Sequence, residues 1–459
     1  MRQKFLNIGS LALLQIVIVG NLQVLPTTAA YGAALPILYL FAVIGFFLPC
    51  ILMVAELATT RPQTGGAYIW CEQAFGAKAG FITVSILWIA NLLWYPSIFL
   101  LIAANFAYLF DISLVQNKFF IIGFSIVLFW LFTGLNCIGV EFSSRASTIF
   151  SIMGVIIPLL LIIVGGAIWV LSDKPSAVPL DKSAFLIDIA HFKNLGYLIA
   201  VVISLFGIEL TAVHAGNVKN PRRSYPVSLL ISSITVLILL VLSALAISII
   251  IPAGSLNAIT GLFDALIQLF NELHLSKLIF PILLLVLLGN IGSIAAWMLG
   301  STRGMYVACQ NNHVATFLQK VNRHEAPVGV LLFEAVIFTV FGTVFLLFPN
   351  VTDSFWLMLD LASQVTLIYY IILFCSAIRL RYKPTLAEGF KIPGGNLLWW
   401  IIMGLGIFTS FLALCAGFIP PDDLGKNEVM LFHIVMIAGL LTAIGLPIMM
   451  LILKKKLND

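Results

Sequence analysis

The chain has 459 residues, of which 61% are hydrophobic and 9% are charged, and its formal net charge is +5. A soluble chain of this length needs far more charge to cover its surface, so the composition excludes a water-soluble globular protein. Apolar runs of about 20 residues recur from end to end, and each can cross the hydrocarbon core of a bilayer. The six cysteines show no paired spacing, which favours small core residues over disulfides or metal ligands.

We therefore expect an all-α polytopic protein in a lipid bilayer, with twelve membrane-spanning helices. Their predicted ranges are 8–34, 35–60, 79–110, 119–137, 147–171, 194–217, 225–251, 278–302, 328–348, 354–378, 397–418 and 430–453. If the N-terminus lies in the cytoplasm, 18 of the 24 lysines and arginines fall on the cytoplasmic side. The positive-inside rule therefore predicts that both termini are cytoplasmic.

The first predicted span is interrupted at mid-membrane depth by the stretch from Gly20 to Thr28, which includes Gln23 and Pro26. Proline removes an amide donor, and glycine loosens the turn before it. Freed backbone groups are tolerated at this depth only where they face protein or a water-filled cavity. The pattern indicates a break that offers backbone groups to a ligand, and a proline-kinked structural helix is the alternative.

The third predicted span carries a polar and aromatic cluster deep in the membrane, formed by Asn91, Trp94, Tyr95 and Pro96. Two interpretations are open. Either the cluster lines a transport pathway, or it is an aromatic packing arrangement around a proline kink.

The sixth predicted span breaks at Gly207, which lies between Phe206 and Ile208 and two residues before Glu209. A glycine at this point lets the backbone open and offer amides and carbonyls to a ligand. A carboxylate among apolar residues is costly, so it usually has a partner or a function.

This second break falls five spans after the first. Interrupted spans at corresponding positions of two halves indicate the substrate site of a transporter. We therefore predict one transporter domain over 1–459, in which the first five helices (8–171) and the next five (194–378) form inverted repeats. The last two helices (397–453) are accessory.

Two further acids lie at membrane depth, Glu334 in the ninth predicted span and Asp360 in the tenth. We expect Glu334 to be structural and Asp360 to cap or line the outer vestibule. His214 either senses pH or bonds to a neighbouring loop. The chain contains no glycine-rich phosphate loop ending in Lys-Ser or Lys-Thr, so transport must draw on gradients. No enzyme activity, cofactor, metal or nucleic-acid partner is expected.

Five motifs occur in order along the chain: PQTGGAYIWCEQAFG at 62–76, FGIE at 206–209, KNPRRSYP at 219–226, STRGMY at 301–306 and FKIPGG at 390–395. Together they resemble the amino acid–polyamine–organocation (APC) superfamily of permeases. The stretches GIELTAVHAGNVKNPRRSYP and RGMYVACQNN are most similar to bacterial glutamate/γ-aminobutyrate antiporters. The resemblance implies a LeuT-like fold, which is a five-plus-five inverted repeat with helices 1 and 6 broken, and transport by alternating access.

The resemblance also implies a bacterial inner membrane, an amino acid substrate held between the broken helices, and no need for sodium. We also consider a homodimer of this chain as its assembly. The expected substrate-binding residues are Val19, Gly20, Asn21, Leu22, Gln23, Asn91, Phe206, Gly207, Ile208 and Ser293. Glu209 aligns with a family-typical acid that either couples transport to protons or braces the broken helix. Gln23 and Ser293 depart from the glutamate antiporters, so glutamate and γ-aminobutyrate cannot be assumed as substrates.

The leading hypothesis is a secondary active transporter that exchanges amino acids across the cytoplasmic membrane. The alternative within this class is a proton-coupled uptake permease for amino acids or amines. An ion or water channel is disfavoured, because the two breaks are dissimilar and form no repeated filter. A membrane enzyme is disfavoured, because the acids are dispersed in the sequence. The interpretation as a transport-inactive sensor stays open.

Overall fold

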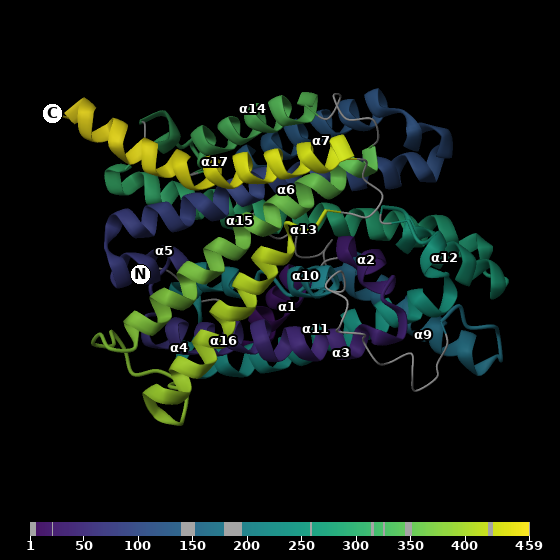
Figure 1. Ribbon diagram of the computed structural model, residues 1–459, viewed down its shortest axis with the longest axis horizontal. Coiled ribbons are helices and arrows are strands. Elements are labelled where there is room, and N and C mark those ends of the chain that lie inside the picture. Colours follow the sequence, from purple (N-terminus) through teal and green to yellow (C-terminus); the bar gives the residue numbers. More distant parts are fainter. Residues whose placement is uncertain are drawn as a thin grey trace.

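In the computed structural model of the chain, the described residues are 6–20, 22–138, 152–178, 195–257, 259–313, 316–324, 326–344, 351–420 and 426–458. They are mostly helical and contain no β-strand, and one isolated bridge pairs Leu6 with Val218. The helices run mainly along the long axis of the molecule, and both ends of the chain lie at the left in Figure 1. The predicted all-α architecture is confirmed.

The helices differ greatly in length, because glycine and proline interrupt some of them and not others. The first elements are α1 (Ile8–Val19), η1 (Leu22–Val24), α2 (Leu25–Ala29), η2 (Gly32–Ala34), α3 (Leu35–Ala42), η3 (Val43–Phe47), α4 (Leu48–Thr60), α5 (Ala67–Phe75), α6 (Ala77–Phe110), η4 (Ile112–Gln116), α7 (Lys118–Ile138), η5 (Ile152–Ile156) and α9 (Ile157–Leu171). The later elements are α10 (Leu195–Ile203), η8 (Ile208–Asn217), α11 (Pro221–Ile250), η9 (Ala253–Ser255), α12 (Gly261–Glu272), η10 (Ser276–Leu278), α13 (Ile279–Ala308), η11 (Cys309–His313), η12 (Thr316–Gln319), α14 (Val328–Val344), α15 (Val351–Leu380), α16 (Gly395–Ala416) and α17 (Lys426–Asn458).

The described residues include ten helical segments that are long and apolar enough to cross a membrane. Two shorter apolar helices, Ile199–Val213 and Val328–Thr343, occupy the positions predicted for the sixth and ninth spans. Each predicted span therefore coincides with an apolar helix, and the exact count of twelve crossings stays a prediction. The first segment ends at Ala29 instead of residue 34, because the chain turns at Gly32, whose φ of +55° suits glycine.

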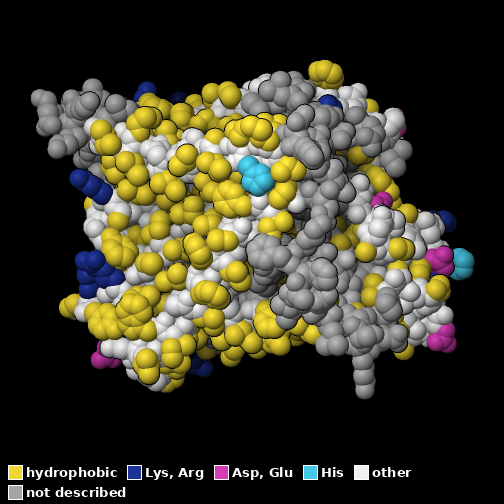
Figure 2. Space-filling model, viewed as in Figure 1, with side chains coloured by type: hydrophobic (Ala, Val, Ile, Leu, Met, Phe, Trp, Pro, Cys, Tyr) yellow, Lys and Arg dark blue, Asp and Glu magenta, His cyan; other side chains and the backbone are white. Residues whose placement is uncertain are grey.

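Lysine and arginine side chains gather at the left end of the face shown in Figure 2, and apolar side chains cover its middle. This left end, named the basic end below, contains α5 and the loops 61–66, 218–220 and 381–394. The loops are tied to the helices, since the Leu386 amide donates a hydrogen bond to the Thr60 carbonyl at 3.1 Å. An apolar middle with a basic rim fits the bilayer environment predicted from the sequence.

A short helix, α12, covers the opposite end of the molecule and was not expected from the sequence. Tyr108, near the end of α6, donates a hydrogen bond to Asp264 of α12 at 2.7 Å. At the other end of α12, Lys174 pairs with Glu272 at 2.6 Å. The hydrogen bond from Lys174, together with its charge, lowers the pKa of Glu272. The helix is therefore anchored to α6 near its start and to the segment after α9 at its end.

A close backbone contact in the core joins η5 to α13 through two glycines. A Cβ atom on Gly154 would lie 2.1 Å from the Cα of Gly289, so the two backbones touch directly. The next residue, Val155, lies against Gly20, whose Cβ would be 3.2 Å from the valine side chain. Small residues let membrane helices approach in this way. The contact places α13 beside the interruption of the first span.

Candidate functional site

The first span is broken where the sequence predicts. The helix α1 ends at Val19, and Gly20 leaves helical geometry with φ −69° and ψ 64°. The chain resumes as η1 and then α2, whose first turn carries Pro26. Asn21, a predicted substrate contact, lies outside the described residues. The break exposes the Ile18 carbonyl to a side-chain donor, since the Trp297 indole N–H donates to it at 3.3 Å.

The sixth span is broken at Gly207, again where the sequence predicts. This glycine has a φ of +102°, in the left-handed region that other residues rarely adopt. Its N–H donates a hydrogen bond to the hydroxyl of Tyr370 on α15 at 2.7 Å. A Cβ atom here would lie 2.7 Å from the Trp297 ring and 2.8 Å from the Ile18 side chain. Both the conformation and the space therefore require glycine.

The two breaks lie side by side, and the Trp297 ring of α13 contacts both of them. It bonds to Ile18 at the first break and packs on Gly207 at the second. Ser293, a predicted site residue, is partly exposed and lies four residues before Trp297, on the same face of α13. The structure thus places Ser293 one helical turn from the indole that contacts Gly207 and the first break. Their role in substrate binding stays a prediction.

Gln23 links the first break to α6. The Trp94 indole donates to the Gln23 Oε1 at 3.0 Å, and the Gln23 Nε2 donates to Ser97 at 3.3 Å. The Trp94 and Trp297 rings lie 5.5 Å apart between centroids. Trp94 is partly exposed, whereas every other residue from Thr83 to Asn105 is buried. Trp94 therefore keeps accessible surface within an otherwise enclosed stretch of α6, and its ring lies beside that of Trp297.

Asn91 lies one helical turn before Trp94, on the same face of α6. Its side chain is 4% exposed, and its Nδ2 donor has no hydrogen-bond partner among the described residues. An unpaired buried donor costs about 1–3 kcal/mol, so such a group often serves a function. The other predicted site residues at the two breaks are buried, namely Val19, Leu22, Phe206 and Ile208. Both interpretations of the third-span cluster stay open, since Trp94 is partly exposed whereas Tyr95 is buried and packs against Phe129.

Glu209 is 2% exposed and lies against α15. The Tyr370 hydroxyl donates to its Oε2 at 2.7 Å, and no described lysine, arginine or histidine forms an ion pair with it. The same hydroxyl accepts the N–H of Gly207, so one tyrosine joins the carboxyl group to the break. Phe46, from the π-helical turn η3, packs edge-on against the Tyr370 ring at 4.9 Å. The geometry therefore includes the bracing contact expected of Glu209, and its proton-coupling role stays a prediction.

The sequence did not identify Trp297 or Tyr370 as site residues. One feature of the sequence could have identified Trp297 as a site residue: it follows Ser293 by four residues and lies on the same helix face. Tyr370 carried no such signal, since its contacts to Gly207 and Glu209 span 163 and 161 positions of sequence.

Glu334 belongs to a separate buried network between α6, α13 and α14. The Trp88 indole donates to its Oε1 at 2.6 Å, and Thr302 donates to the same atom at 3.1 Å. The side chain is 0% exposed and reaches neither a basic loop nor the interface. These contacts agree with a structural role.

Asp360 is partly exposed and lies ten residues before Tyr370 on α15, which is about 15 Å along a helix axis.

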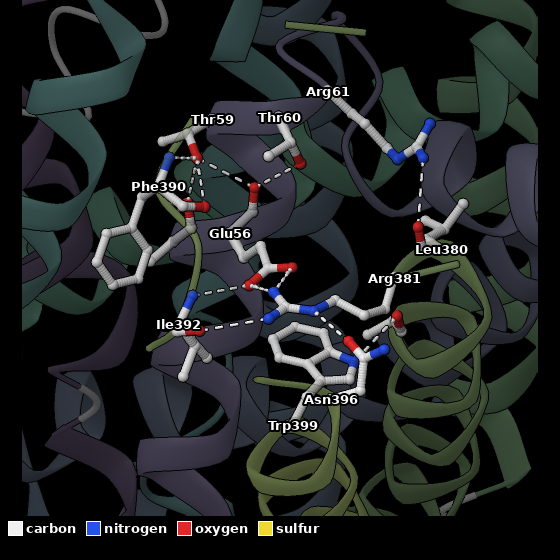
Figure 3. Close-up of polar contacts among 12 residues, drawn as sticks. Glu56, Thr59, Thr60, Arg61, Leu380, Arg381, Phe390, Ile392, Asn396 and Trp399 are labelled. Atoms are coloured by element: carbon white, nitrogen blue, oxygen red, sulfur yellow. Dashed lines mark hydrogen bonds and ion pairs between the residues drawn. The ribbon is translucent and has the colours of Figure 1, made fainter. Parts of the chain in front are cut away.

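A buried ion pair fastens the basic end (Figure 3). Arg381, just after α15, pairs with Glu56 of α4, and the two side chains are 9% and 5% exposed. The Ile392 amide also donates to Glu56, at 3.0 Å. The guanidinium group donates to Asn396 at 3.3 Å and lies over the Trp399 ring at 5.2 Å. The pair therefore connects α4, the end of α15 and α16.

The segment after the second break is also enclosed at the basic end. The Gly65 amide donates to the Val213 carbonyl at 3.3 Å, and the Lys219 amide donates to Leu6 at 2.8 Å. Arg61 anchors the same region, since it donates to the Pro384 carbonyl at 2.9 Å. The side chains of His214 and Asn217, between these contacts, lie outside the described set.

The amino-acid sequence matches the family model described as amino acid permease over residues 5–440. It is 40% identical over 446 residues to an uncharacterized transporter of Legionella pneumophila, and the alignment covers 97% of this chain and 96% of that protein. It is 26% identical over 430 residues to a glutamate/gamma-aminobutyrate antiporter of Lactococcus lactis, covering 92% and 85%. It is 24% identical over 395 residues to a probable agmatine/putrescine antiporter of Lactococcus lactis, covering 85% and 83%.

Proposed function

Because the chain belongs to the amino acid permease family, we propose that it exchanges amino acids across a bacterial inner membrane by alternating access. The exchange passes through a site between the breaks at Gly20 and Gly207. Both termini lie in the cytoplasm, and the inverted repeats are 8–171 and 194–378. Relatives with antiporter names, at 26% and 24% identity, support exchange as the mode of transport.

One observation carries the proposal: the two helix breaks lie side by side, and a single indole, that of Trp297, contacts both of them. An amino acid zwitterion needs donors for its carboxylate and acceptors for its ammonium group. Amides at the start of a half-helix supply donors and a favourable dipole for the carboxylate. Carbonyl groups at the opposite break supply acceptors for the ammonium. Two adjacent breaks can therefore bind the carboxylate and the ammonium group of one amino acid.

Proton-coupled uptake is the second candidate, and Glu209 is the observation that favours it. The carboxyl group lies two residues from Gly207, is almost fully buried, and has hydroxyl and amide groups rather than cations as described partners. A buried acid within membrane-spanning helices is a common element of proton relays. Binding and release of a proton by Glu209 as the break opens and closes would couple transport to a pH gradient.

Uptake by proteoliposomes separates these candidates. The purified protein is reconstituted, and uptake of labelled amino acids is measured with and without internal amino acid, and with and without an imposed pH gradient. Exchange predicts uptake only into vesicles that contain amino acid. Proton coupling predicts uptake into empty vesicles when the pH gradient is imposed. Absence of uptake under all four conditions would contradict both candidates.

A further inference from the structure

We propose that the site at the two breaks selects amino acids with an uncharged side chain, which lies between Trp94 and Trp297 and accepts a hydrogen bond from Asn91. The inference rests on the proposed function and specifies its substrate class. It differs from the charged substrates that the names of two relatives suggest, glutamate and agmatine.

The groups described around the two indoles are aromatic and neutral. Trp94 and Trp297 are both partly exposed, and their ring centroids are 5.5 Å apart. The polar groups next to them are neutral as well: the Gln23 amide bonds to Trp94, and Ser293 lies one turn from Trp297. Such a surface stabilises apolar or uncharged polar groups by contact and hydrogen bonding. It offers a second carboxylate no counter-charge.

Cationic side chains lie at the ends of the candidate membrane spans, and Arg303 of α13, six residues after Trp297, is exposed. In the candidate membrane spans, each described lysine or arginine is within two residues of a span end: Lys78, Lys118, Arg222, Arg223, Lys277 and Arg379. The amides of the two breaks can neutralise one carboxylate, which every amino acid carries. A side-chain carboxylate such as that of glutamate would then be buried without a cation, and this is unfavourable in a low-dielectric site.

The acids are equally poor partners for a cationic side chain. Glu334 is bonded to Trp88 and Thr302, which lie about 9 Å and 7.5 Å along their helices from Trp94 and Trp297. Asp360 lies about 15 Å from Tyr370 along α15.

Glu209 is the nearest acid to the breaks, and it is directed at α15 by the Tyr370 hydroxyl. A neutral carboxyl attracts no cation, and an ionised one repels an anionic side chain while its Oε2 is held by the Tyr370 hydroxyl.

Asn91 supplies the donor that an uncharged side chain can use. Its Nδ2 lacks a partner among the described residues, and one helical turn separates it from Trp94. Because the amide is enclosed, a small rotation of its side chain accompanies substrate binding. Asn105 provides a matched control on the same helix. It too is buried with an unpaired amide atom, and it lies about 21 Å further along α6.

The test is competition against uptake of labelled glutamine at pH 7 by reconstituted protein. We expect unlabelled leucine, phenylalanine and glutamine to compete, and glutamate, arginine and agmatine to compete at least about 100-fold more weakly. Equal competition by glutamate or arginine would overturn the inference while leaving amino acid transport in place. If no amino acid of any charge is taken up, the proposed function fails and the inference fails with it.

Two variants locate the selectivity. Asn91→Ala should raise the KM for glutamine by about 10-fold with little change in kcat, as expected from loss of one hydrogen bond, whereas Asn105→Ala should leave KM unchanged. Ser293→Lys places a cation one turn from Trp297 and should admit glutamate. An unchanged KM in Asn91→Ala, or equal effects of Asn91→Ala and Asn105→Ala, would remove Asn91 from the site. Rejection of glutamate by a Ser293→Lys protein that still takes up glutamine would contradict the charge argument.

Discussion

Tyr370 donates a hydrogen bond to Glu209 at 2.7 Å, although 161 positions of sequence separate the two residues. The tyrosine hydroxyl also accepts the Gly207 N–H, so α15 supplies the hydrogen bonding that the interrupted sixth span lacks. A broken helix at membrane depth is stable only when other groups satisfy its freed backbone. The contact therefore explains how the break persists in the core of the protein.

Substitutions of this pair should separate its structural and proton-carrying roles. Glu209→Gln retains an acceptor for Tyr370, so we expect a thermal unfolding temperature in detergent close to that of the wild type. Tyr370→Phe leaves both partners unsatisfied and should lower the free energy of unfolding by about 1–3 kcal/mol per group. Tyr382→Phe is the control, since its hydroxyl is on an exposed residue and bonds only to exposed Trp400.

The pH dependence of uptake decides the role of Glu209. If this carboxyl carries a proton during transport, Glu209→Gln removes the titration, and uptake becomes independent of pH across the range in which wild-type uptake changes. An unchanged pH profile with intact turnover would assign Glu209 the bracing role alone.

The ion pair between Glu56 and Arg381 should contribute strongly to stability. Both groups are almost fully buried, so removal of either leaves an unpaired charge, and Arg381→Ala should destabilise the protein by about 3–5 kcal/mol. Arg222→Ala is the matched control. It breaks an ion pair with Glu388 whose side chains are 63% and 91% exposed, and we expect no measurable change in thermal unfolding. Equal effects of the two variants would show that burial of the pair is unimportant.

The glycine contact between η5 and α13 should tolerate no added methyl group. Gly154→Ala or Gly289→Ala forces the two backbones apart and should cost about 1–3 kcal/mol or more in the free energy of unfolding. In Gly123→Ala on α7, the new methyl group meets no neighbouring atom within 4 Å, so this variant should be as stable as the wild type or slightly more stable. Comparable melting temperatures for all three variants would contradict the close approach.

The two breaks were predictable because glycine and proline act on the backbone locally. The pairing of Gly20 with Pro26, and Gly207 beside Glu209, predicted an interruption, and the structure is broken at these places. Proline alone is a weaker signal, since α6 continues through Pro96. The helix positions were predictable for a similar reason, since the length of each apolar run is set by the bilayer.

The side chains that join the breaks were not predictable, because their contacts cross the whole chain. Trp297 reaches Ile18 across 279 positions, and no local pattern reports such a partner. Gln23 was predicted to face substrate, and the structure adds that its amide is bonded to Trp94 and Ser97. The helix α12 was missed because it is short, amphipathic and covers one end of the bundle instead of spanning it.

The central claim is that amino acids pass through the contact between the two breaks, and Gly207→Ala tests it most directly. The new methyl group would lie 2.7 Å from Trp297 in a backbone conformation that alanine rarely adopts. Gly254→Ala is the control, since Gly254 lies in the exposed turn η9 and an added Cβ would meet nothing within 4 Å. In proteoliposomes loaded with amino acid, we predict uptake of labelled glutamine by the wild type and by Gly254→Ala, and loss of uptake by folded Gly207→Ala. Uptake by Gly207→Ala at the wild-type rate would contradict the account.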